Sequence, residues 1–124
     1  MDSKPVDPVQ HPQDAAESLR KFNHATYATT HNPRPLPYPG EAYRAIAAYT
    51  ALAYRMPQGF EHIGNALDTL AEAGHLTADH GDVDHHVNAA IAALNEADEL
   101  ARSLAAVLER AHSATGVLGY SGPQ

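Results

Sequence analysis

The chain has 124 residues, of which 44% are apolar, and a formal net charge of −7 at pH 7 with histidine neutral. The absence of cysteine excludes disulfides and thiolate metal sites and is typical of a reducing compartment. No stretch approaches the roughly 18 consecutive apolar residues of a membrane span, and the N-terminus lacks the apolar run of a signal peptide. We therefore expect a cytoplasmic protein that does not cross a membrane.

Charge is distributed unevenly along the chain. Residues 1–56 contain six Lys and Arg against five Asp and Glu, whereas residues 57–124 contain two against ten, which gives +1 and −8. Such an acidic C-terminal half is a poor binder of phosphate backbones, so nucleic acid is not the expected partner. Two alternatives remain open, an acidic mimic of DNA and a DNA-associated regulator. The basic residues available to such a regulator are Arg20, Lys21, Arg34, Arg44 and Arg55.

The first predicted element is a helix that follows a polar tail. Residues 1–13 include three prolines among polar residues, which predicts a flexible tail. Asp14 and Glu17 form a variant of the capping box and predict the start of a helix. An apolar stripe continues to about Thr30, where the following Asn-Pro dipeptide restricts the backbone to extended geometry.

A proline-rich connector is predicted for residues 32–40. Four prolines alternate with other residues there, and each proline fixes its own φ and restricts the residue before it. The pattern predicts a stiff, extended crossover between two ends of a helical bundle. A ligand for an aromatic groove is the alternative interpretation.

Two further helices are predicted on either side of Pro57. The segment from Glu41 to Arg55 is apolar on most sides, which is typical of a helix surrounded by neighbours. Proline is tolerated at the first helical position, so Pro57 either begins a third helix or kinks one longer helix. The third helix would end at Gly74, a natural C-terminal glycine.

The last third of the chain carries an unbroken apolar heptad, within a long helix predicted from about Gly81 to Ala114. Its members are Val83, Val87, Ala90, Leu94, Ala97, Ala101, Leu104, Leu108 and Ala111. They share one helix face, so a helix of about 28 residues and roughly 42 Å needs a partner surface along its length. The seven from Val87 to Leu108 are the predicted core or interface residues, either within an intramolecular bundle or between two copies of the chain.

These elements together predict an all-α fold that resembles a four-helix bundle, with an extended proline-rich crossover and a long C-terminal helix. One helical domain is expected over residues 14–115, followed by a frayed tail over 116–124. A small alanine-rich domain of this kind often gains stability from a second copy. A homodimer is therefore the expected state.

A cluster of histidine and aspartate over residues 79–86 is the candidate metal site. Asp82 and His86 are four residues apart and share a helix face, and His80 and His62 are possible further ligands. Zinc is the cofactor that such a set would hold. The alternative is an acidic helix start with exposed histidines. The spacing matches neither a zinc protease nor a carboxylate-bridged di-iron bundle.

Two short segments, Arg34-Pro35-Leu36-Pro37-Tyr38-Pro39 and Arg55-Met56-Pro57-Gln58, lie before and after a helix. On these segments, residues 35–63 resemble small helical proteins of actinomycete accessory and mobile elements, most of which have no assigned activity. The resemblance implies a compact helical protein with a regulatory role.

The sequence offers no nucleophile motif and no glycine-rich phosphate loop, so we predict no catalytic or organic cofactor-binding residues. The leading hypothesis is a non-enzymatic helical module for protein–protein interaction or dimerisation, with an unidentified protein partner. A metal-binding helical protein is the second hypothesis.

Overall fold

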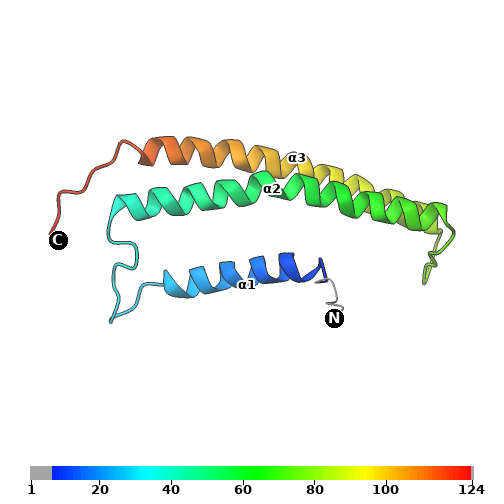
Figure 1. Ribbon diagram of the computed structural model, residues 1–124, viewed down its shortest axis with the longest axis horizontal. Helices are drawn as coiled ribbons and strands as arrows, with labels where there is room; N and C mark the ends of the chain where they lie inside the picture. The colour runs from blue at the N-terminus through cyan, green and yellow to red at the C-terminus, as the bar shows by residue number, and fades with distance from the viewer. Residues whose placement is uncertain (1–6, 124) are drawn as a thin grey trace, which may run out of the picture. The chain divides into compact units, whose positions relative to one another are not determined.

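The computed structural model describes residues 7–123, which form three α-helices and no strand (Figure 1). The helices are α1 (Gln10–Ala25), α2 (Pro39–Glu72) and α3 (Val83–Thr115). The all-α prediction is confirmed. The four-helix bundle is wrong for a single chain, because the two helices predicted around Pro57 are one helix, α2. The chain divides into two compact units, one ending at Tyr38 and the other starting at Pro39. The single domain predicted over 14–115 spans both units.

Pro57 lies inside α2 without ending it. A proline in a helix interior removes the hydrogen bond to the carbonyl four residues earlier, here that of Ala53. The ring of Pro57 is buried, as is Ala53, and both face α3. Packing of the ring against α3 offsets the lost hydrogen bond, so the helix continues through the position at which the sequence pattern predicts a boundary.

The first unit consists of α1 and the segment that follows it. The helix begins four residues before the predicted Asp14, because the carboxylate of Asp7 accepts a hydrogen bond from the backbone N–H of Val9 (3.0 Å) and starts the helix there. It ends before the predicted Thr30. Thr29 instead closes a turn, in which its hydroxyl accepts from the backbone N–H of Asn32 (3.0 Å). Residues 1–6 of the predicted tail lie outside the described residues.

No residue of α1 is buried within its unit. Its half-buried residues, Leu19, Phe22 and Thr26, repeat at three and four residues and form a narrow stripe. Glu17 and Arg20 form an ion pair on the solvent side (2.7 Å), and the hydrogen bond from Arg20 lowers the pKa of the Glu17 carboxyl. Residues 32–38 of the proline-rich connector form bends rather than helix or strand.

The second unit is an antiparallel hairpin of α2 and α3 (Figure 1). The loop between the helices turns at Gly74 and Gly81, which both have φ of 73°, a conformation that glycine adopts without strain. Asp82 is the N-cap of α3 and accepts a hydrogen bond from the backbone N–H of Asp84 (3.3 Å). The long C-terminal helix is confirmed, with observed bounds of Val83–Thr115.

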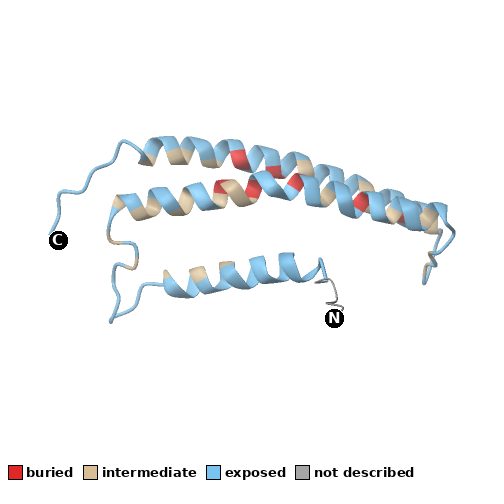
Figure 2. Cartoon of the chain, viewed as in Figure 1, coloured by how far each residue is buried: buried red, intermediate tan, exposed pale blue. Residues whose placement is uncertain are grey.

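The two helices of the hairpin pack along a seam of residues spaced by three and four. All of these residues are buried or half-buried (Figure 2). On α2 the seam comprises Thr50, Ala53, Pro57, Phe60, Gly64, Leu67 and Ala71, and on α3 it comprises Val87, Ile91, Leu94, Asp98, Ala101, Ala105, Leu108 and His112. The least exposed residues are alanines, Ala53 at 1% and Ala105 at 0%, which lets the two backbones approach closely.

The open end of the hairpin is closed by an aromatic contact. The rings of Tyr43 on α2 and His112 on α3 are stacked, with centroids 3.9 Å apart and an interplanar angle of 21°. Gly116, which caps α3, lies against the same tyrosine ring. None of the helices in the described part of the chain combines the length and apolar character that a membrane span requires.

Candidate interaction surface

The hairpin has two sides, one on each flank of the seam. We call residues of one helix that are spaced by seven a column, because they lie one above another along the helix. Two antiparallel helices are related by an approximate two-fold axis perpendicular to the plane that contains both. Equivalent columns of the two helices therefore lie on the same side of that plane. Tyr54 follows the seam residue Ala53 on α2, and Glu109 follows the seam residue Leu108 on α3. Their side chains are hydrogen-bonded to each other. This contact across the seam fixes which columns share a side.

The polar side consists of the columns that contain this pair. Its members are Tyr54, Glu61 and Asp68 on α2 and Asn88, Asn95, Arg102 and Glu109 on α3. The hydroxyl of Tyr54 donates to the carboxylate of Glu109, and that hydrogen bond raises the pKa of Tyr54 above its ordinary value. The Nε of Arg102 donates to Asp98 (2.6 Å), and that bond raises the pKa of Arg102.

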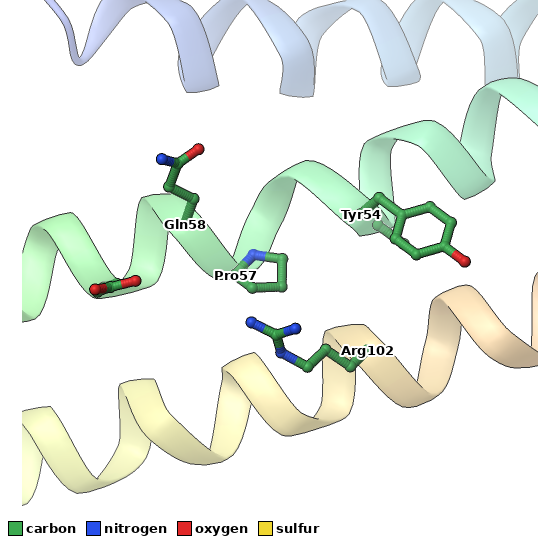
Figure 3. A pocket seen from close by; sticks show the side chains of 6 residues that line it. Tyr54, Pro57, Gln58 and Arg102 are labelled. Carbon is green, nitrogen blue, oxygen red and sulfur yellow. The ribbon is translucent and has the colours of Figure 1, made fainter.

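A hollow of about 440 Å³ opens on the polar side beside Pro57. It is lined by Ala53, Tyr54, Pro57, Gln58, Glu61 and Arg102. Figure 3 shows the guanidinium of Arg102 reaching from α3 towards the proline ring. Because Asp98 and Glu61 both act electrostatically on this guanidinium, its charge is already balanced by the protein. The hollow is therefore an unfavourable site for an anionic ligand.

The apolar side lies on the opposite flank of the seam. It consists of two adjacent columns on each helix, and none of their residues is charged. On α2 they are Tyr49, Met56, Ile63 and Leu70 with Leu52, Gly59, Ala66 and Ala73, and on α3 they are Ala90, Ala97, Leu104 and Ala111 with Ala93, Leu100, Val107 and Ala114. Three of the large side chains are more than 45% exposed on α3, namely Leu100 at 63%, Val107 at 49% and Leu104 at 47%.

Three large side chains of α2 are exposed on the same side: Met56 at 41%, Ile63 at 51% and Leu70 at 41%. With those of α3 they form a contiguous apolar surface rather than isolated exposed residues. Surfaces of this kind on a folded unit usually mark contacts with other macromolecules. The apolar side is the candidate functional surface.

The predicted core and interface residues divide between the seam and this surface. Val87, Leu94, Ala101 and Leu108 lie in the seam, whereas Ala90, Ala97 and Leu104 lie in the neighbouring column on the apolar side. The seam residues missed by the heptad prediction are Ile91, Asp98, Ala105 and His112. The sequence contains one indication of this second column, because Ile91 is a large apolar residue directly after Ala90. The sequence pattern favours the column with more apolar members, and in the structure that column lies at the edge of the seam, with Ala90, Ala97 and Ala111 half-buried and Leu104 47% exposed.

The predicted metal ligands do not form one cluster in the structure. His86 Nε2 donates to the carbonyl oxygen of His80 (2.7 Å), and the two imidazole rings meet edge to face at 5.2 Å. Asp82 caps α3, and His62 is ten residues, or about 15 Å, before the end of α2. Among residues 7–123, no three His, Asp or Glu side chains are grouped so as to hold a metal ion. Zinc binding stays a prediction, and the observed role of His86 is to close the loop.

Comparisons with known proteins do not add a family. No protein-family model matches the chain. No curated protein and no solved structure is significantly similar to it. The resemblance to actinomycete helical proteins stays a prediction, and the function is argued from the hairpin itself.

Proposed function

We propose that the protein is a non-enzymatic helical interaction module and that the apolar side of the hairpin is its binding surface. The single observation that supports this most is the exposure of six large apolar side chains on one flank of the seam, in columns without any charged residue. These side chains are about half-exposed, so burying the rest of each against a partner contributes roughly half of the value for a fully exposed side chain, or about 1 kcal/mol. A surface of this extent favours association with another apolar helical surface.

The charge of the hairpin favours a protein partner over a lipid surface. Residues 39–123 contain four arginines and no lysine, against eleven Asp and Glu. Amphipathic helices that bind membranes present Lys and Arg beside their apolar face and are attracted to anionic lipids. An acidic hairpin is repelled by such lipids, whereas the apolar face of another helix carries no such penalty.

Site-specific photo-crosslinking in cells tests the proposal. A photoreactive phenylalanine derivative replaces Leu104 in the full chain, and the matched control carries it at Ser103, which is exposed on the adjacent column. A second pair uses Ile63 and His62 in the same way. We expect protein adducts from positions 63 and 104 and none from 62 and 103. Equal adduct formation at all four positions, or none at any, contradicts the proposal.

A further inference from the structure

We infer that the partner of the apolar side is a second copy of this chain, so that two hairpins form a four-helix bundle. The inference rests on the proposed function, since it names the occupant of the same surface. Each helix of the hairpin carries two stripes, the seam and the apolar side. At 100° per residue, the centre of the apolar side on each helix lies about 100° around from the centre of the seam. A helix in a four-helix bundle contacts two neighbours at approximately a right angle, which these two stripes match.

The register of α2 against α3 determines which residues of two copies would face each other. Gly64 lies level with Leu94 across the seam, since a Cβ at Gly64 would be 4.0 Å from Leu94 Cδ1. That register gives the level of every other residue along the hairpin. When a second hairpin is rotated about an axis parallel to the helices, α2 of one copy lies over α3 of the other at the same level.

In that arrangement large residues meet small ones over part of the surface. Ile63 of one copy is level with Ala93 and Ala97 of the other, and Leu100 of one copy is level with Gly59 of the other. Alternating large and small residues on facing helices is the condition for interdigitated packing without voids. Leu104 of one copy is instead level with Leu52 and Met56 of the other, so at that level two large apolar side-chain groups are buried against each other.

The area and the charge of the surface agree with a stable dimer. The columns of α2 on the apolar side extend from Tyr49 to Ala73, about 25 residues or about 37 Å, and two packed helices are about 20 Å wide, which gives about 750 Å². A standard protein interface buries about 800 Å² on each partner. Two copies of a surface without charges also bury no unpaired ion between them.

Light scattering on the purified full chain tests the inference. We expect a mass near 26 kDa at tens of micromolar, twice the 13.2 kDa of one chain. Leu104→Glu and Ile63→Glu place a carboxylate in the interface and should each weaken dimerisation at least 100-fold. Ser103→Glu and His62→Glu add a carboxylate one residue away and should leave the mass unchanged. Circular dichroism establishes that each variant keeps its helices, since Leu104 and Ile63 are half-exposed in the hairpin.

The outcomes separate this inference from the proposed function. A wild-type chain that stays monomeric at 13.2 kDa, a mass above twice that value, or a Leu104→Glu variant that stays dimeric overturns the second copy. If a monomeric chain still gives adducts from position 104 with a different protein, the interaction module stands and its partner is not a second copy. If neither dimer nor adduct forms, both proposals fail.

Discussion

The seam and the apolar side are adjacent stripes on the same two helices, yet the most buried residues of the seam are small while large residues of the apolar side stay exposed. The seam is closed by small residues such as Ala53, Gly64 and Ala105, whereas Ile63 and Leu104 stand half-exposed beside it. Small residues bring the two backbones together, but each contributes little apolar area to burial. Much of the large apolar surface of the hairpin therefore lies on the side that the hairpin alone leaves open.

Enlarging the seam should have the largest effect on stability. Ala105 is 0% exposed, so Ala105→Leu forces extra methylenes between the helices and should lower the free energy of unfolding by about 1–3 kcal/mol. Ala106→Leu is the control, because Ala106 is exposed and should change the stability by less than about 0.5 kcal/mol. Urea denaturation measures both. Equal losses for the two variants would show that residue 105 does not face α2.

The loop before α3 sets the register of α3 against α2. Gly81 in this loop has both a positive φ and a close neighbour, the ring of His86. Its φ is 73°, and a Cβ there would lie 3.0 Å from His86 Nε2. Gly81→Ala should therefore lower the free energy of unfolding by about 1–2 kcal/mol, because an L-residue is strained at positive φ. Gly40→Ala, in the first turn of α2 with open space around it, is the control and should not destabilise the chain. An unchanged denaturation midpoint for Gly81→Ala would contradict the conformation of the loop.

Filling the seam at Gly64 should instead stabilise the hairpin. Gly64 is in the interior of α2, and its new Cβ would make ordinary contacts of 3.9 Å with Ile91 Cγ1 and 4.0 Å with Leu94 Cδ1. Gly64→Ala reduces the conformational entropy of the unfolded chain, so we expect a gain of about 0.5–1 kcal/mol. Thermal denaturation followed by circular dichroism measures the gain. A loss would mean that the helices are closer at this level than the structure shows.

The sequence predicts α3 well because the signal is local. Its apolar period, the aspartate at its start and the glycine after its end all act within one helix. The polyproline pattern predicts a stiff, extended crossover over residues 32–40, whereas the chain bends at several of residues 32–38 and α2 already begins at Pro39. Pro57 is different, since the gain that keeps it helical is packing against α3, which no local pattern reports.

The position of the seam was harder to predict, for a physical reason. On α3 the column containing Ala90 is wholly apolar, whereas the adjacent column alternates Ile91 and Ala105 with Asp98 and His112, so the sequence favours the first. The column with Ile91 is chosen although it contains Asp98, whose carboxylate stays 27% exposed and bonds Arg102. Periodicity identifies an apolar face but not which half of a wide face meets the first neighbour. Leu104, predicted as core or interface, consequently lies outside the seam.

The polar side is where we expect the smallest effect of a substitution on stability. Its contact across the seam is the hydrogen bond from Tyr54 to Glu109, which raises the pKa of Tyr54 above 10.0. A raised pKa in the folded state means that the neutral phenol is favoured there. The stabilisation is therefore complete below about pH 10 and is lost as the pH rises through the folded-state pKa. Tyr54→Phe should lower the melting temperature slightly at pH 8, and the difference from wild type should vanish at higher pH.

Melting temperatures from pH 7 to pH 11 test this pH dependence. Tyr27→Phe is the matched control, because Tyr27 is 74% exposed in the other unit, and it should leave the melting temperature unchanged throughout. A Tyr54→Phe deficit that persists above the folded-state pKa would show that the hydrogen bond of the neutral hydroxyl to Glu109 is not its cause, because phenylalanine keeps the ring and removes only the hydroxyl. Because Tyr54 is itself 55% exposed, solvent screens the bond and the effect stays small. The polar contacts on this side act within the hairpin, whereas its exposed large apolar side chains lie on the opposite flank.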